Sequence, residues 1–254
     1  MFSQCSHNLK MTDNIVKKYN NYCRSSWGRR RSKLIYSQIK SKRKKYHRIL
    51  DLGCGIGAVT HKFLNGQVEI FAIDRIPGML NKFKKSISPK LKSKIYFKNK
   101  NVSSFLSSYR GEKFDLILCH NILDYIENKS DFLYLLHKVA KKRCVLSVVV
   151  MNLYAEIIRK ARKGEWIKAI ELNRSRRYHS NNFGEDITLY TPNEWLKIFE
   201  KTKWNIYKWS GVGIIDETLY KNEQKRSINS ELKLSELYPY KEQAILIHFM
   251  CSNP

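Results

Sequence analysis

The chain has 254 residues, of which 43% are hydrophobic and 12% aromatic, so it can bury a large core, which excludes wholesale disorder and favours a single α/β domain. Its 48 lysines and arginines outnumber 22 acidic residues, giving a formal net charge of +26. Such a charge is typical of proteins that bind polyanions, most simply nucleic acid, although drift toward Lys, Asn and Ile would leave the same composition.

Helical structure is predicted first, over residues 12–43, where aromatic and aliphatic residues recur among basic ones. From residue 48, apolar runs alternate with helical windows. Strands are expected over 48–53, 68–74, 94–99, 114–119 and 143–151, and helices after Gly57 and over 77–86, 102–108 and 130–141. This alternation predicts βαβ units and a doubly wound, mostly parallel sheet.

The rhythm changes after Met151. Residues 154–172 are predicted to form an exposed helical insertion, and the following NRSRRYHSNNFGED a basic loop without periodicity. Thr191 is a plausible N-cap of the next helix, with Pro192 at its first position and Glu194 completing a capping box. Two further strands, over 204–214 and 244–251, bring the predicted sheet to seven strands.

The stretch RILDLGCGIGAVT, residues 48–60, places Gly53, Gly55 and Gly57 directly after an apolar run. This spacing predicts a strand that turns sharply into a helix and lets the backbone approach a nucleotide. The glycines also fit the dinucleotide pattern G-x-G-x-x-A, so by themselves they leave the ligand open. No G-K-[ST] follows, which excludes a Walker-type phosphate loop.

Two carboxylates narrow the choice of ligand. Asp51 is expected at the end of its strand, where its charge would repel a phosphate but attract the ammonium and sulfonium groups of S-adenosylmethionine. Asp74 ends the next strand about 20 residues after the glycines, where an acidic residue accepts the two hydroxyls of an adenosine ribose. Either residue could instead cap the helix that follows.

KFDLILCHNILDYIEN, residues 113–128, brings His120 to the same edge of the sheet. The D-x-G-x-G-x-G loop, the acid that ends the second strand and F-D-L-I-L before a helix resemble the class I S-adenosylmethionine-dependent methyltransferases over roughly residues 45–150. The resemblance implies a Rossmann-like methyltransferase fold with S-adenosyl-L-methionine as cofactor. The expected cofactor contacts are Arg31, Asp51, Gly53, Cys54, Gly55, Asp74, Lys100, Asn101 and His120.

The whole chain resembles the CmoM-type tRNA methyltransferases, which methylate the carboxylate of 5-carboxymethoxyuridine at the wobble position of the anticodon. In this resemblance, His120 stands where that family has a histidine that contacts the cofactor. Arg31, in WGRRR, is the counterpart of a cofactor-binding arginine. The chain departs from the family at Gly213, where an arginine is expected, and at Ile245-Leu246, where Arg-Tyr is expected.

A carboxylate acceptor is ionised at neutral pH and is its own nucleophile, so no catalytic base is predicted, only positioning and desolvation. Cations and aromatic rings are needed to hold the acceptor, and Arg174, Arg176, Arg177 and Tyr178 are predicted to bind it. A solvated loop is the alternative for this group. A small-molecule acceptor, such as a quinone precursor or a free carboxylic acid, and a non-catalytic cofactor-binding protein associated with RNA remain alternatives for the chain.

The expected organisation is one domain: a helical extension (1–44), a cofactor-binding half (45–151), an insertion or lid (152–190) and a substrate-side half (191–254). Six scattered cysteines without a C-x-x-C pair argue against a zinc site or disulfide framework and suit a reducing cytosol. The first residues lack a signal-peptide pattern, and the longest apolar run is far shorter than a membrane span. We expect a cytoplasmic protein that binds tRNA, with no metal and no membrane partner.

Overall fold

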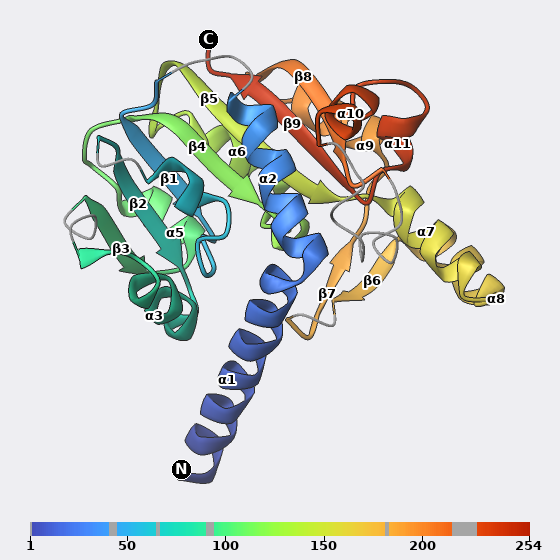
Figure 1. Cartoon of the computed structure of the whole chain (residues 1–254), viewed down its shortest axis with the longest axis horizontal. Coiled ribbons are helices and arrows are strands. Elements are labelled where there is room, and N and C mark those ends of the chain that lie inside the picture. Colours follow the sequence, from blue (N-terminus) through green and yellow to red (C-terminus); the bar gives the residue numbers. More distant parts are fainter. Residues whose placement is uncertain (1, 41–44, 65–66, 90–93, 181–182, 215–227) are drawn as a thin grey trace.

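Seven strands form one sheet in the order β3-β2-β1-β4-β5-β9-β8 (Figure 1). The computed structural model describes residues 2–40, 45–64, 67–89, 94–180, 183–214 and 228–254. The strands are β1 Arg48–Leu52, β2 Glu69–Asp74, β3 Ile95–Asn99, β4 Phe114–His120, β5 Ala140–Met151, β8 Asn205–Val212 and β9 Leu246–Ser252. The first five pair in parallel, and β9 runs antiparallel to both β5 and β8. The predicted fold class, a doubly wound, mostly parallel sheet, is therefore confirmed.

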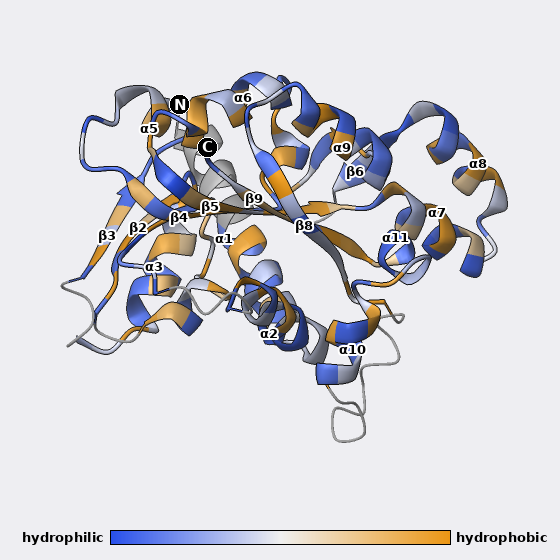
Figure 2. Ribbon diagram, turned by 90° about the horizontal axis from the view of Figure 1, so that it is seen from above, coloured by the Kyte–Doolittle hydropathy of each residue, from blue (hydrophilic) through white to orange (hydrophobic). Residues whose placement is uncertain are grey.

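Helices cover both faces of the sheet (Figure 2). On one face lie α2 Ser26–Lys40, η1 Thr60–Phe63, α3 Pro77–Lys85 and α10 Ile228–Leu234, and on the other α5 Val102–Ser108, α6 Lys129–Leu136 and α9 Pro192–Glu200. Two short segments, η2 Leu123–Tyr125 and α11 Tyr240–Gln243, complete these layers. The first helix, α1 Phe2–Arg24, projects from the body of the molecule toward the N-terminus (Figure 1).

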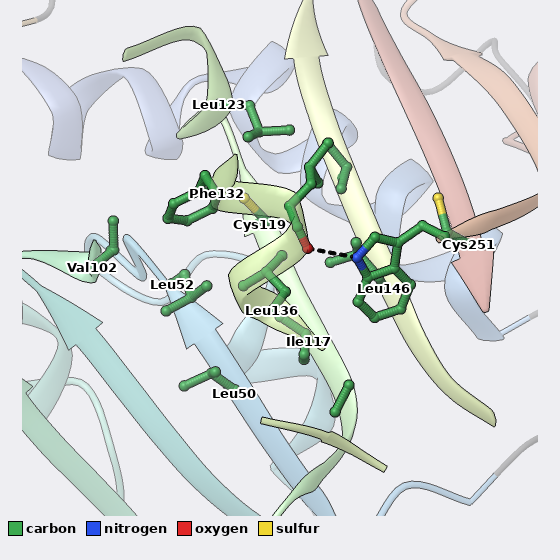
Figure 3. Packing of buried hydrophobic residues seen from close by; sticks show 14 of the residues in the cluster. Leu50, Leu52, Val102, Ile117, Cys119, Leu123, Phe132, Leu136, Leu146 and Cys251 are labelled. Carbon is green, nitrogen blue, oxygen red and sulfur yellow. Dashed lines mark hydrogen bonds between the residues drawn. The ribbon is translucent and has the colours of Figure 1, made fainter. Parts of the chain in front are cut away.

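Each face of the sheet carries its own apolar core. Leu52, Ile117 and Leu146 come from neighbouring strands and pack against Leu136 and Phe132 of α6 (Figure 3). Burying a side chain of this size stabilises the fold by about 1.5 to 3 kcal/mol relative to exposure. Because both faces of the central parallel strands β1 and β4 are buried, these strands read as continuous apolar runs, which is the pattern that identified them.

Met151 is followed by two helices and a hairpin: α7 Leu153–Arg162, α8 Trp166–Ser175, β6 Arg177–Ser180 and β7 Glu185–Thr188. The prediction of an irregular loop over 173–186 is therefore wrong. Arg176 adopts a left-handed conformation, with φ of 60°, that ends α8, and Tyr178 then pairs with Ile187 across the hairpin. The hairpin is held by tertiary packing, since Ile187 belongs to a small core with Leu153 and Leu172. Asn181 and Asn182 lie outside the described residues.

Other expectations need smaller corrections. The helix expected after Gly57 is only the 3-10 turn η1, where Thr60 donates a hydrogen bond to Asp51. The helix expected over 12–43 is divided at Ser25 into α1 and α2, and residues 41–43 lie outside the described residues. The capping box of Thr191 and Glu194 is confirmed. No described helix combines the length and the apolar character needed to span a membrane.

Candidate active site

A cavity of about 750 Å³ opens at the carboxyl ends of the parallel strands. Gly53 after β1, Asp74 at the end of β2, His120 at the end of β4 and Met151 at the end of β5 all line it. In open α/β sheets this edge is where ligands bind, because the crossover helices leave a crevice there. The volume is within the range of small-molecule sites and accommodates a nucleoside-sized ligand together with part of an acceptor.

The glycine loop needs its glycines for conformation and for space. Gly53 and Gly57 have φ angles of 66° and 75°, which side chains rarely adopt. A Cβ added at Gly53 would lie 2.0 Å from Ile122 Cδ1, and one at Gly57 2.2 Å from the Phe83 ring. Gly53 and Gly55 line the cavity, whereas the neighbouring Cys54 is buried and does not line it.

Asp74 ties the glycine loop to the end of β2. One of its carboxylate oxygens accepts a hydrogen bond from Gly55 N at 2.8 Å, and the other accepts one from Ile76 N at 2.8 Å. The side chain is 8% exposed and faces the cavity. Burial raises the pKa of Asp74, while the two backbone hydrogen bonds lower it. Each oxygen keeps a lone pair, so the carboxylate can still accept hydroxyl groups of a ribose.

Asp51 lies behind the loop, and it is absent from the lining of the cavity. It is 5% exposed and accepts a hydrogen bond from the Thr60 hydroxyl. Burial raises the pKa of Asp51 to about 7, against the lowering effect of Thr60, and the charge of Asp74 raises it further. Asp51 therefore does not contact a ligand in the cavity, contrary to the prediction. Any attraction to a cationic ligand acts across the glycine loop, and the carboxyl is only partly ionised at neutral pH.

Arg31 of α2 also lines the cavity. Its guanidinium lies 4.9 Å from the centroid of the Tyr22 ring and donates a hydrogen bond of 3.4 Å to the Tyr22 hydroxyl. The side chain is 4% exposed, and no residue in the described part of the chain accepts a hydrogen bond from its Nε. A buried guanidinium with an unused donor that lines a cavity is suited to binding a carboxylate, such as that of a methionine moiety.

His120 is the first member of a chain of buried hydrogen bonds. Its Nε2 lies 2.8 Å from Ser147 Oγ, which lies 2.7 Å from His248 Nε2. His248 Nδ1 lies 2.7 Å from Gln38 Oε1, and Gln38 Nε2 donates to the Gly211 carbonyl at 2.9 Å. The chain thus runs from the cavity through β5 and β9 to α2.

The Gly211 carbonyl determines every donor in this chain, because a carbonyl can only accept. The Gln38 amide must turn its oxygen to His248, so Nδ1 of His248 carries the proton and its Nε2 accepts from Ser147. Ser147 then accepts from Nε2 of His120, and Nδ1 of His120 is left with a lone pair. Burial lowers the pKa of His248 to about 3 and also lowers that of His120, which keeps both rings neutral.

Of the two remaining predicted cofactor residues, Asn101 lines the cavity and Lys100 does not. Asn101 lines the cavity and caps α5, accepting a hydrogen bond from Ser103 N at 2.9 Å. Lys100 is exposed and does not line the cavity. Asn121 was not among the predicted contacts, yet it lines the cavity with φ of 54° and a buried Oδ1 that has no partner among the described residues. Its position directly after the strand was the signal that could have identified it.

The far end of the cavity is built by α7 and the hairpin. Arg159 and Arg162 of α7, and Lys163 at its C-cap, line it together with Glu156. Arg159 donates two hydrogen bonds to Glu156, at 2.9 and 2.5 Å, and one of 3.4 Å to the Tyr178 hydroxyl. This end therefore presents more positive than negative charge, next to an aromatic ring.

The predicted acceptor-binding group divides between the cavity and the surface. Tyr178 lines the cavity, whereas Arg174, Arg176 and Arg177 do not. Arg176 forms an ion pair with Glu194 at 3.3 Å instead. Arg159, Arg162 and Lys163 line the cavity in place of these arginines. Their spacing of three and four residues, which puts them on one face of a helix, was the sequence pattern that could have predicted this.

The hairpin also contacts the segments that build the cofactor end of the cavity. Arg75, just after β2, forms an ion pair with Glu185 of β7. The Phe183 ring lies 5.9 Å from that of Tyr19 on α1 and 5.4 Å from that of Tyr125. These contacts join segments that the sequence pattern did not connect, and they assign α1 to the wall of the cavity.

The departures at Gly213 and Ile245 also have a structural explanation. Both residues line the cavity. Gly213 has φ of 76°, and an added Cβ would lie 2.3 Å from the Trp27 ring. Trp27 therefore occupies the space that an arginine at position 213 would need, so the acceptor end is arranged differently from the one the resemblance implies.

Comparison with known sequences gives a match of residues 43–203 to the family described as "Methyltransferase domain". The mitochondrial ubiquinone biosynthesis O-methyltransferase of Schizosaccharomyces pombe (strain 972 / ATCC 24843) is 29% identical over 115 residues. That alignment covers 44% of this chain and 41% of the relative, so the chain matches less than half of that protein's length.

Solved structures with the same fold include three methyltransferases of low sequence identity. A protein of Thermotoga maritima, described as a possible histamine N-methyltransferase, has a TM-score of 0.65 at 10% identity, covering 96% of this chain and 99% of its own. The plantazolicin methyltransferase BamL, solved with S-adenosylhomocysteine, has a TM-score of 0.56 at 17% sequence identity, and the match covers 98% of this chain and 91% of BamL. The N-methyltransferase NodS of Bradyrhizobium japonicum WM9, also solved with S-adenosylhomocysteine, has a TM-score of 0.55 at 13% sequence identity, and the match covers 92% of this chain and 91% of NodS.

Proposed function

The chain belongs to the methyltransferase domain family and is an S-adenosylmethionine-dependent methyltransferase; from this premise we propose that its acceptor is the carboxylate of 5-carboxymethoxyuridine at the wobble position of tRNA. The product would be a methyl ester. Cytoplasmic tRNA as partner is part of the same proposal. Because the chain is an enzyme, the alternative of a non-catalytic cofactor-binding protein is set aside.

The observation that carries the proposal is the charge of the acceptor end. Arg159 and Arg162 of α7 and Lys163 at its C-cap line one end of the cavity, and Glu156, which forms an ion pair with Arg159, lines it with them. An anionic acceptor can form hydrogen bonds with these cations, since charge-assisted hydrogen bonds to arginine are the stronger ones in a partly dry site. Tyr178 provides a ring on which an unpaired base can stack.

The chemistry of a carboxylate acceptor agrees with the rest of the cavity. When bound, S-adenosylmethionine supplies an electrophilic methyl group on its sulfonium sulfur. The protein then has to exclude water and hold the carboxylate oxygen in line with that group, without removing a proton. Burial and the hydrogen bond to Ser147 hold His120 neutral, so it contributes an acceptor atom to the cofactor end rather than a charge.

A small-molecule acceptor is the second candidate, and it is favoured by the partial similarity to a ubiquinone biosynthesis O-methyltransferase. Tyr125 and Phe183 give the cavity an aromatic wall that suits a phenolic ring. Such an acceptor would have to lose a proton, and the lowered pKa of His120 makes its Nδ1 a weak base for that step.

The test combines purified protein, radiolabelled S-adenosylmethionine, and tRNA with or without 5-carboxymethoxyuridine. Base-labile label on the modified tRNA alone would support the proposed ester. Label on neither tRNA, with cofactor binding still measurable by calorimetry, would overturn it in favour of a small acceptor.

A pair of arginine variants tests the charge of the acceptor end. Arg162→Ala removes a cation that lines the cavity, and we expect KM for the modified tRNA to rise about 10-fold, the effect of one lost charge-assisted contact. Arg174→Ala is the matched control, because it removes an exposed arginine outside the cavity. Equal effects of the two variants would contradict the assignment of acceptor binding to α7.

A further inference from the structure

A second hollow, of about 1060 Å³, lies on the other side of the wall formed by α1 and the glycine loop. Its walls come from the end of α1, from α2, from η1 and from α3, which share one face of the sheet (Figure 2). The methyltransferase reaction uses none of these side chains, because the cavity described above is lined by the opposite side of the same segments.

The lining of this groove is strongly basic. Five of its exposed cations are Arg24 of α1, Lys33 of α2, Lys62 of η1, and Lys82 and Lys85 of α3. Arg29 and Arg30 of α2 also line the groove, and Arg30 forms an ion pair with Glu231. Within the described parts of the chain, no aspartate or glutamate lines the groove, and none of these five cations forms an ion pair with a carboxylate. Elsewhere on the surface, cations such as Arg75 and Arg176 are paired.

These cations also repel one another. Burial lowers the pKa of Lys62, and the charge of Lys33 lowers it further. Clustered like charges destabilise a fold, so these five cations, which have no carboxylate partner among the described residues, are best explained by an anionic ligand that neutralises them. Ser37 lines the same groove and adds a hydroxyl donor suited to phosphate oxygens.

The position of the groove relates it to the reaction cavity. On α1, Tyr19 and Tyr22 line the cavity, while Asn20 and Arg24 line the groove. In the loop, Gly55 lines the cavity and Ile56 and Ala58 line the groove. A ligand in the groove is thus separated from the cofactor end only by one helix and one loop.

We propose that this groove binds the phosphate backbone of the RNA acceptor. The inference deepens the proposed function and rests on it. Cations contributed by several separate elements along an open groove fit a series of phosphates better than a single phosphate. The groove would hold the RNA body and the cavity would receive only the nucleotide to be methylated, which divides affinity from chemistry.

The test measures RNA binding rather than methylation. Fluorescence anisotropy with an unmodified tRNA transcript is recorded for wild type and for the triple variant Lys62→Glu, Lys82→Glu, Lys85→Glu. The matched control, Lys197→Glu, Lys201→Glu, Lys203→Glu, makes the same charge change at exposed lysines in and just after α9, on the opposite face of the sheet (Figure 2). Calorimetry with S-adenosylmethionine checks that each variant is folded, and a Lys→Gln triple replaces the groove variant if it is not.

We expect the groove variant to bind tRNA at least 10-fold more weakly than wild type, with the slope of log affinity against log salt reduced by about 2 to 3, and the control to change little. Equal losses of tRNA affinity in both triple variants, or an unaltered slope in the groove variant, would overturn the proposal.

The outcome of this test is separable from that of the proposed function. If tRNA binding depends on the groove but no methyl group is transferred to modified tRNA, the groove is established and the proposed acceptor is wrong. If the ester forms but tRNA binding does not depend on the groove, the acceptor is established and the groove proposal is wrong.

Discussion

The two ends of the reaction cavity are built in different ways. At the cofactor end, Gly53, Gly55 and Asp74 are held by backbone geometry at the edge of the sheet, with two backbone amides bound to one carboxylate. At the acceptor end, Arg159 and Tyr178 are held by side-chain contacts within an inserted segment that has its own small core. Backbone geometry leaves little freedom to vary, whereas a segment with its own core can change side chains without disturbing the sheet. We therefore expect the inserted segment, rather than the cofactor end, to determine the acceptor.

The largest expected effect is at the cofactor end. Asp74→Ala removes the proposed ribose ligand and two backbone hydrogen bonds of the loop, and we expect S-adenosylmethionine to bind at least 100-fold more weakly, about 3 kcal/mol. Calorimetry measures this, with Asp131→Ala at an exposed position of α6 as the control. A comparable loss of tRNA affinity would break the division between the two ends.

Arg31 gives the next largest effect and sharpens the assignment of the cofactor end. If its guanidinium binds the methionine carboxylate, Arg31→Ala should weaken S-adenosylmethionine by about 10- to 100-fold. Methylthioadenosine has the same nucleoside without that carboxylate, so its affinity should change little. Equal losses for the two ligands would show that Arg31 supports the fold of the cavity instead.

Asp51 predicts a pH dependence of stability. The pKa of this carboxyl is raised in the folded protein to about 7, so the folded state binds a proton that the unfolded state releases between about pH 4 and 7. Stability from this group is present below pH 4 and is lost as pH rises toward 7, by up to about 1.4 kcal/mol per pH unit. Asp51→Asn lacks the transition, so denaturant unfolding should favour the variant increasingly as pH rises. A constant difference between the two proteins would contradict the raised pKa.

The smallest effect concerns the hydrogen-bond chain behind His120. Ser147→Ala removes the acceptor for Nε2 of His120, and we expect about a 5-fold loss of cofactor affinity, close to one neutral hydrogen bond. Nitrogen NMR of the ring should report a single tautomer protonated at Nε2 in the wild type and a mixture in the variant. The Nδ1 tautomer in the wild type would show that the chain runs in the opposite direction.

Much of the fold could be predicted because its elements are defined by local pattern. The five parallel strands, the capping box at Thr191 and the turn at the glycines each depend on residues within one segment. The hairpin at 177–188 could not be predicted in this way, because its strands are short and polar and are held by packing of Ile187 against α7 and α8. Because the chain leaves α8 and enters this hairpin at Arg177, Tyr178 lines the cavity while Arg174, at the end of α8, stays on the surface.

The sequence by itself determined the fold class, the glycine loop and the placement of Asp74 and His120 at one edge of the sheet, since parallel topology brings the carboxyl ends of its strands to one edge whatever the details of packing. Only the tertiary structure decided the rest. It brought Gln38 to His248 across 210 positions, placed Trp27 against Gly213 and turned the cations of α7 into the cavity. Contacts between distant segments depend on how side chains fill space, and periodicity along one segment carries no information about that.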